Sequence, residues 1–167
     1  TFYGTANSNQ LMLEFMGLQL PGASFVPPHT PLRDALTRFA VKRAIELAHE
    51  EIGLGDMVNT HSLVNAAIGL LASGGSTNHA IHLMAIGKAA GIQMNWDDLS
   101  ALSQVIPLIA KVYPNGQADV NHFHAAGGVP FMIRSLLEEG LLHPSVQTIM
   151  GSGLGSFAND AHWTQGT

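Results

Sequence analysis

Hydrophobic residues recur at helical spacing over most of the chain, and segments rich in glycine and proline separate these stretches. The first helix is predicted over residues 5–17, where apolar side chains lie four positions apart. Thr5 or Asn7 can cap its start, and Gly17 suits its end. Residues 20–28 contain three prolines and cannot continue a helix, so they are predicted to form a loop.

A second, longer helix is predicted from Pro31 to Gly53. Thr30 followed by proline is a typical helix start, because the threonine side chain caps the helix and proline fits its first turn. Residues 62–72 are rich in alanine and leucine, which favours a helix over a strand. A glycine-rich turn follows, and then a further helix that extends to Gly91.

Two more helices are predicted in the second half of the chain. Residues 95–98 form a turn that can cap a helix starting near Leu99. Apolar residues at 129, 132, 133, 136 and 137 follow the spacing of an amphipathic helix, which Gly140 ends. Helices therefore dominate the predicted structure.

Short strands are predicted in two places. Residues 105–112 carry β-branched side chains around Pro107, and residues 146–150 form a second short candidate. Helices preceded by glycine-rich turns are typical of α/β architecture. We therefore expect an α/β fold: a helix-dominated internal part of a larger α/β domain with short, mostly parallel strands. An all-α fragment is the alternative.

The composition changes this picture by indicating missing neighbours. Charged residues make up 11% of the chain, against about 25% in typical soluble domains. A surface so poor in charge is expected to pack against something else, and the start at Thr1 without a methionine predicts a piece of a larger protein. The net charge of −5 argues against nucleic acid or an anionic membrane surface as a partner. No apolar stretch approaches the roughly 20 residues of a transmembrane helix.

Histidine is the most frequent residue type with metal-binding potential. The chain has nine histidines and no cysteine, which excludes a disulfide scaffold and any thiolate metal site made within it. His79 and His82 share one helix face and could hold one metal ion, and His122 and His124 lie two apart. Without further ligands at a recognisable spacing neither pair is a metal motif, and packed or hydrogen-bonded histidines are the favoured interpretation.

The turn at residues 74–78, Gly-Gly-Ser-Thr-Asn, is the better candidate for a binding site. Two glycines let the backbone approach a ligand closely, and the positive end of the next helix can receive an anion. Simple helix capping by Ser76 or Thr77 explains the same residues equally well. Residues 5–7 begin another helix, so a group placed just before Thr1 would lie at a second positive helix end.

Seven motifs in order along the chain resemble the dihydroxy-acid and 6-phosphogluconate dehydratase family. They are TFYGTANSNQ (1–10), LPGASF (20–25), TPLRDA (30–35), GGSTNH (74–79), GIQMNWDD (91–98), YPNGQADVNHF (113–123) and AAGG (125–128). Within the family, the opening and the stretch 113–123 are more similar to the branch that acts on the phosphorylated sugar acid. The link over residues 52–56 is shorter than the family pattern leads us to expect, which indicates a missing loop.

The resemblance implies an activity. Residues 1–167 would be part of the N-terminal, cluster-bearing domain of a cytoplasmic, homodimeric hydro-lyase, and would be inactive alone. The enzyme would convert 6-phospho-D-gluconate to 2-keto-3-deoxy-6-phosphogluconate in the Entner–Doudoroff pathway. Its partners would be this small phosphorylated sugar acid and the remainder of the same polypeptide. The alternatives are a dehydratase of dihydroxy acids or of sugar acids without phosphate and, from another class, a non-catalytic helical interaction domain.

The resemblance also implies cofactors and contacts. A [4Fe-4S] cluster would act as Lewis acid on the departing hydroxyl, with its ligand cysteines outside this chain, and a divalent cation such as Mg²⁺ would accompany it. No catalytic or metal-ligating residue is expected within the chain. Thr5 and Asn7 are expected to line the cluster side of the pocket. The expected substrate contacts are Ser76, Thr77, Asn78 and His122.

Overall fold

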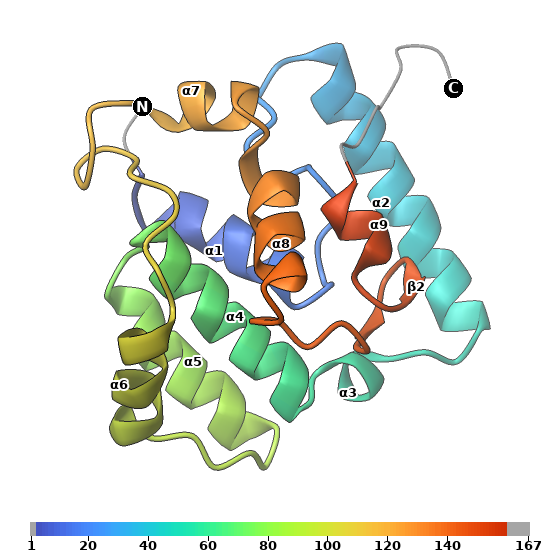
Figure 1. The fold of residues 1–167 in the computed structure, drawn as a ribbon. Coiled ribbons are helices and arrows are strands. Elements are labelled where there is room, and N and C mark those ends of the chain that lie inside the picture. Colours follow the sequence, from blue (N-terminus) through green and yellow to red (C-terminus); the bar gives the residue numbers. More distant parts are fainter. Residues whose placement is uncertain (1–2, 160–167) are drawn as a thin grey trace.

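Helices make up most of the fold, which Figure 1 shows as a computed structural model describing residues 3–159. Residues 1 and 2 of the opening motif therefore lie outside the described residues, as do residues 160–167. The elements are α1 (Thr5–Phe15), α2 (Pro31–His49), α3 (Leu54–Met57), α4 (Thr60–Ser73), α5 (Asn78–Ala89), α6 (Trp96–Val105), α7 (Val120–Ala125), α8 (Gly128–Glu138), β1 (Gln147–Thr148), β2 (Gly151–Ser152) and α9 (Gly155–Ala158).

Helix α4 lies at the centre of the packing. Ten of its fourteen residues are buried, helices α1, α5 and α6 pack against it, and it shares an apolar cluster with α8. Helix α1 approaches α4 at Gly69, where a Cβ atom would lie 2.6 Å from the Phe15 ring. The sequence thus places its most apolar helix in the core and a glycine where a neighbouring aromatic ring needs the space.

Helix starts follow the capping chemistry of the sequence in α2 and α6. Thr30 Oγ1 accepts a hydrogen bond from Arg33 N at 3.2 Å, as predicted. Asn95 Oδ1 accepts hydrogen bonds from the backbone amides of Asp97 and Asp98. Helix α6 therefore begins at Trp96, three residues before the predicted start, because both aspartates belong to its first turn.

Helix α1 starts differently from the prediction. Gly4 is the N-cap residue and makes no side-chain cap bond, so the prediction that Thr5 or Asn7 caps the helix is wrong. Thr5 is the first helical residue, and its hydroxyl bonds to another segment of the chain. At the other end, Gly17 adopts a φ of +77° just beyond the helix, as a terminating glycine should.

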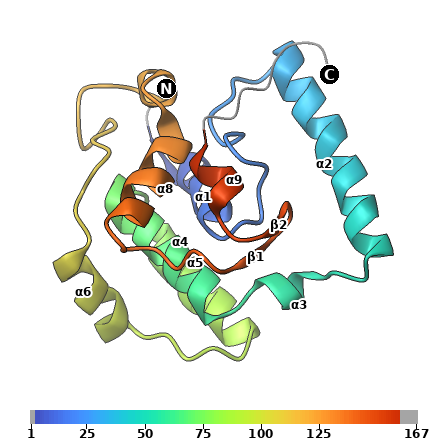
Figure 2. The same cartoon turned by 45° about the vertical axis from the view of Figure 1, so that its right-hand side comes forward.

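Helix α2 runs along one side of the molecule, clearly visible in Figure 2. Only Leu36 and Leu47 of its residues are buried, and the helix ends at His49 rather than near Gly53. The chain turns at Glu51, whose φ is +58°, and then forms the short helix α3. Residues 54–56 of the short link over residues 52–56 therefore belong to α3.

The short strand predicted over residues 146–150 is confirmed in part, because β1 lies within it, but the predicted parallel pairing is not confirmed. Strands β1 and β2 pair in the antiparallel sense, since only a two-residue turn joins them and parallel strands need a long crossover. Residues 105–112 form no strand: α6 extends through Val105, and the amides of Ile109 and Ala110 both donate to the carbonyl of Ala72. Within residues 3–159 the sheet content is this hairpin and one isolated parallel bridge, Val112 to Ala118.

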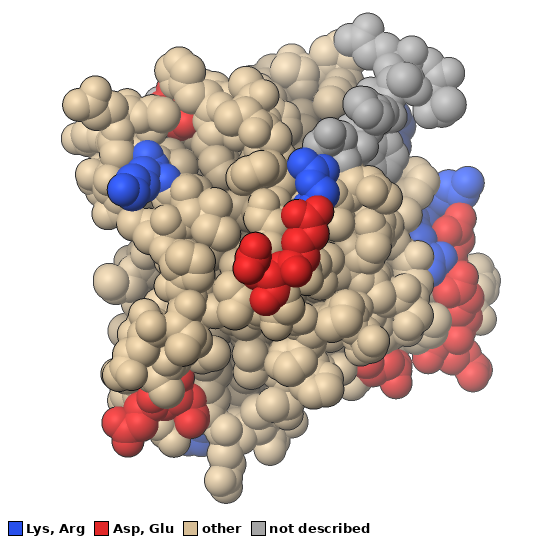
Figure 3. Space-filling model, in the orientation of Figure 1, with Lys and Arg blue, Asp and Glu red and all other residues tan. Residues whose placement is uncertain are grey.

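The surface is as poor in charge as the composition indicates. Figure 3 shows Lys, Arg, Asp and Glu in a few separated groups, with wide uncharged areas between them. One group lies on α2, where Arg43 pairs with Glu46 and Glu50. Among the helices of the described part, none is long and apolar enough to span a membrane.

Candidate functional site

Two motifs that are about seventy residues apart in the sequence meet at one cleft of about 680 Å³. Residues 3–7, at the start of α1, form one wall, and residues 74–77, before α5, form the other. Pro114 and Asn115 complete the lining. None of these lining residues carries a charge.

Hydrogen bonds join the two walls. Thr5 Oγ1 lies 3.0 Å from Ser76 Oγ, and Asn78 Nδ2 donates to both hydroxyl oxygens at 3.1 Å. The backbone amide of Asn78 also donates to Ser76 Oγ, at 3.3 Å. Ser76 is therefore the centre of a small polar network that includes residues from both motifs.

Two glycines make the second wall possible. Gly74 adopts a φ of +58°, and its carbonyl accepts a hydrogen bond from Asn115 Nδ2 at 2.7 Å. A Cβ atom on Gly75 would lie 2.6 Å from the Leu70 side chain and 3.0 Å from that of Ser8. The turn can pass this close to α1 and α4 only because it has no side chains at these two positions.

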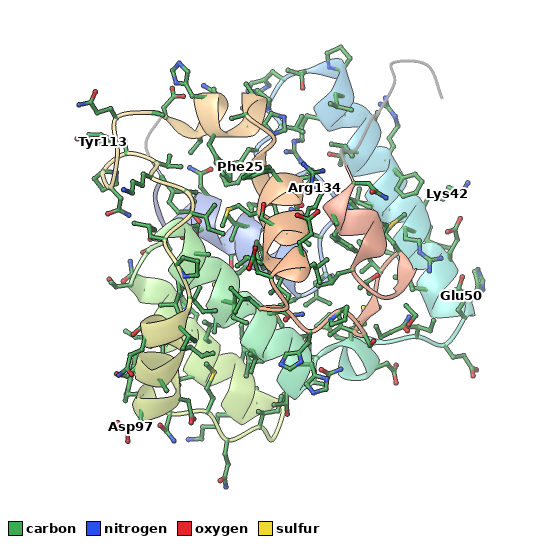
Figure 4. All side chains as sticks on the ribbon, viewed as in Figure 1. Phe25, Lys42, Glu50, Asp97, Tyr113 and Arg134 are labelled. Carbon is green, nitrogen blue, oxygen red and sulfur yellow. The ribbon has the colours of Figure 1, made fainter. Side chains whose placement is uncertain are left out.

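Two buried polar pairs adjoin the cleft. Tyr3 Oη lies 2.8 Å from Ser73 Oγ, and burial raises the pKa of the Tyr3 hydroxyl above its ordinary value. The backbone amide of Tyr3 donates a hydrogen bond to the carbonyl of Tyr113, which Figure 4 shows in the loop beside the start of α1. Ser8 and His79 form a second buried pair, with Ser8 Oγ 2.9 Å from His79 Nδ1.

The electrostatics of the cleft come from backbone dipoles, since its lining has no charged side chain. Helices α1 and α5 both begin here, so the positive ends of two helices border the cleft. The amides of residues 5–7 precede the first bond within α1, which runs from Ser8 N to Gly4 O. Such an arrangement suits a ligand that is anionic and rich in oxygen atoms.

Helix capping without a ligand explains part of the hydrogen bonding in the turn before α5. Ser76 Oγ accepts from the amide of Asn78, so this side chain does cap the first turn of α5. Thr77 is the N-cap residue and makes no side-chain cap bond. Capping therefore accounts for one bond of Ser76, but not for its bonds to Thr5 and to the Asn78 side chain.

The structure brings five of the six predicted site residues together. Thr5, Asn7, Ser76 and Thr77 line the cleft, and Asn78 bonds to its rim. His122 lies elsewhere, on α7, where its exposed ring bonds through Nδ1 to Asp119 Oδ1 at 2.9 Å.

Residues that the sequence reasoning missed are Ser8 and Asn115, whereas the packed, hydrogen-bonded state favoured for His79 is confirmed. His122, by contrast, does not line the cleft and borders a separate cavity of about 340 Å³ beside α7 and α8. A polar residue within the apolar face formed by Leu11 and Phe15 could have revealed Ser8.

No metal centre is formed by the described residues. The rings of His79 and His82 are 5.5 Å apart, but no group of three potential ligands occurs between residues 3 and 159. The chain also has no cysteine, so its own residues do not fit an iron–sulfur cluster without thiolates from elsewhere.

Comparisons with known proteins agree with the motifs. The family described as "Dihydroxy-acid/6-phosphogluconate dehydratase N-terminal" matches residues 1–157. Phosphogluconate dehydratase of Rhizobium meliloti (strain 1021) is 58% identical over 163 residues, 96% of this chain and 27% of the relative.

Two further relatives place the chain within that family. Phosphogluconate dehydratase of Escherichia coli (strain K12) is 56% identical over 94% of this chain and 26% of its own length. The chloroplastic dihydroxy-acid dehydratase of Arabidopsis thaliana is 35% identical over 90% of this chain and 25% of its own length. The chain thus spans about a quarter of the length of these relatives. It belongs to the dihydroxy-acid/6-phosphogluconate dehydratase family, as part of the N-terminal region.

Proposed function

We propose that the protein containing this chain is a hydro-lyase that converts 6-phospho-D-gluconate to 2-keto-3-deoxy-6-phosphogluconate in the Entner–Doudoroff pathway. The relatives at 56–58% identity are named phosphogluconate dehydratase, whereas the dihydroxy-acid dehydratase is 35% identical. The observation that carries the proposal is the cleft in which two family motifs meet. This substrate is an anion with several hydroxyl groups, which suits a polar cleft bordered by two helix starts.

In this proposal, the chain binds and orients the substrate. The hydroxyl and amide groups of Thr5, Ser76 and Asn78 are placed to bond with oxygen atoms of the sugar acid or its phosphate. During dehydration a proton leaves the carbon beside the carboxylate, the neighbouring hydroxyl leaves as water, and the resulting enol becomes the keto acid. We assign the base for this proton to residues outside this chain.

The cofactors belong to the same proposal. A [4Fe-4S] cluster, when bound by the whole protein, would supply a Lewis acid for the leaving hydroxyl. Because the chain has no cysteine, the thiolate ligands of the cluster come from other parts of the protein. We assign the oxygen ligands of a divalent cation such as Mg²⁺ to other parts of the protein as well. Thr5 and Asn7 would border the cluster side of the cleft.

The uncharged surface fits the proposed partners. We infer that the remainder of the same polypeptide covers much of the area that Figure 3 shows without charge. The whole enzyme is proposed to be a homodimer in the cytoplasm, where its phosphorylated substrate would be present.

An anaerobic assay of the full-length protein tests this function. Turnover of 6-phosphogluconate is measured beside turnover of a branched dihydroxy acid, and iron and sulfide are counted in the same sample. We expect turnover of the phosphorylated acid and a cluster. Activity only on the other acid would move the substrate within the family, and absence of iron and activity would favour the interaction-domain alternative.

Replacing Asn78 by alanine tests the cleft itself. The change removes the amide that bonds to Thr5 Oγ1 and Ser76 Oγ. We expect the KM for 6-phosphogluconate to rise about tenfold, the effect of one lost hydrogen bond in a binding site. The matched control is Gln104→Ala, which removes an exposed amide on α6. Steady-state kinetics of the full-length protein would contradict this role if Asn78→Ala matched the control.

A further inference from the structure

The buried pair of Ser8 and His79 adjoins the cleft through the bond from the Ser76 amide to Ser8 Oγ, and the proposed function assigns it no role. Ser8 is 0% exposed and His79 is 2% exposed. They come from α1 and α5, the two helices that begin at the cleft, and Ser8 Oγ lies 2.9 Å from His79 Nδ1. Buried polar side chains of this kind persist where they satisfy one another.

The hydrogen-bond inventory of Ser8 shows what the histidine does. A serine hydroxyl has one hydrogen and two lone pairs. Ser8 Oγ accepts a bond from the amide of Ser76 at 3.3 Å, and the carbonyl oxygens of Gly4 and Thr5, at 3.1 and 3.3 Å, lie within reach of its hydrogen. Gly4 O already accepts from the Ser8 amide at 3.0 Å. His79 Nδ1, at 2.9 Å, is nearer to the hydroxyl than either carbonyl and is its side-chain partner, so this bond restricts how the hydroxyl turns its lone pairs toward Ser76.

Ser76 connects the Ser8–His79 pair to the polar groups of the cleft. Its amide is held by Ser8, while its hydroxyl bonds to Thr5 and Asn78. We propose that His79 is a positioning residue, which acts through Ser8 to fix Ser76 and, with it, the polar groups that face the substrate. The kinetic part of this inference rests on the proposed function.

The protonation of His79 is consistent with this role. Burial, and then the neighbouring His82, lower the pKa of His79 below its ordinary value. The ring is consequently neutral near pH 7 and can bond to a neutral hydroxyl without placing a charge beside the cleft. The positioning role of His79 is based on the distances from Ser8 Oγ to His79 Nδ1 and to the Ser76 amide, whatever the charge of the ring.

Two substitutions separate positioning from packing. His79→Asn keeps a polar nitrogen or oxygen near the position of Nδ1, whereas His79→Leu keeps the bulk and removes the hydrogen bond. If His79 only fills space, leucine is tolerated and asparagine is not; if it positions Ser8, the order is reversed. His143→Leu serves as the control, because His143 is an exposed histidine that stacks on His61, away from the cleft.

The first readout needs no activity. Hydrogen exchange of the peptide containing Ser76 is measured in the full-length protein and its variants. We expect exchange at Ser76 to become about tenfold faster in His79→Leu, since its acceptor loses a fixed orientation, and to stay slow in His79→Asn and His143→Leu. Ser8→Ala removes the acceptor itself and sets the upper limit of the effect. If His79→Leu does not fold, His79→Gln, which moves the polar group away from the position of Nδ1, should give the fast exchange in its place, and slow exchange in that variant would contradict the proposal.

The second readout is kinetic. For 6-phosphogluconate, KM should rise about tenfold in His79→Leu with unchanged kcat, and His79→Asn should restore it. Equal behaviour of leucine and wild type, or equal failure of leucine and asparagine, overturns the proposal. If the wild type does not act on 6-phosphogluconate, the proposed function fails, while the exchange experiment still decides the role of His79.

Discussion

Replacing Phe15 by alanine is expected to lower the free energy of unfolding by about 3–5 kcal/mol, the usual cost of removing a buried aromatic side chain. Phe15 is 0% exposed and belongs to the largest apolar cluster of the core. Its ring lies against Gly69, where no side chain can move into the space that alanine would leave. The resulting cavity therefore persists, and its cost adds to the lost transfer energy.

The measurement is chemical denaturation of the full-length protein, followed by hydrogen exchange of peptides from α1 and α4. Phe131→Ala is the matched control: Phe131 is 42% exposed on α8, so its truncation removes less buried apolar surface. We expect the control to change stability by less than about 1 kcal/mol. Similar losses in the two variants would show that Phe15 has no special place in the core.

The second large effect concerns pH and Glu14: the stability contributed by this residue should fall as pH rises from about 4.5 to about 7. Glu14 is fully buried in α1, and burial raises the pKa of its carboxyl from 4.5 to about 7. Hydrogen bonds from the amides of Gly22 and Ser24, at 2.8 and 2.7 Å, oppose the increase and hold the loop onto the helix.

The sign follows from proton binding. Because the folded state binds this proton more tightly than the unfolded state, protonation stabilises the fold below pH 4.5. This contribution is lost progressively as pH rises through the folded pKa near 7. At about 1.4 kcal/mol per pKa unit, the full change is on the order of 3 kcal/mol.

Glu14→Gln provides the test. Other groups also titrate, so the quantity compared is the stability of wild type minus that of the variant, measured at pH 5 and at pH 8 by denaturation. We expect this difference to be larger at pH 5, since only the wild type loses stability through ionisation of this side chain. Glu139→Gln, an exposed carboxylate at the end of α8, should show no such change. A difference independent of pH would contradict the raised pKa of Glu14.

Local chemistry made the helices predictable. The cap of α2 by Thr30 and the apolar spacing of α8 depend on neighbouring residues, and both are confirmed. The strand predicted over residues 105–112 was wrong because β-branched side chains also fit the end of a helix and an irregular segment bonded to Ala72. The pairing of β1 with β2 depends on the geometry of the turn between them, which the spacing of hydrophobic residues does not indicate.

The candidate site was predictable in parts but not as a whole. Each polar helix start, at Thr5 and at Ser76, is visible in the sequence, because glycine and small polar residues are preferred at helix N-termini. That the two starts face each other depends on how α1 packs against α4 and α5, which involves residues about seventy positions apart. His122 illustrates the same limit: capping by Asp119 holds α7 beside a different cavity.

A cleft with walls from two distant segments also couples occupancy to folding. A ligand held by both walls binds only while α1 remains docked, so each binding event favours the docked state by mass action. If the proposed substrate is that ligand, its concentration would set how often the start of α1 detaches from the turn before α5. By this linkage, a cell in which the substrate is abundant would protect this part of the protein from local opening and from the proteases that exploit it.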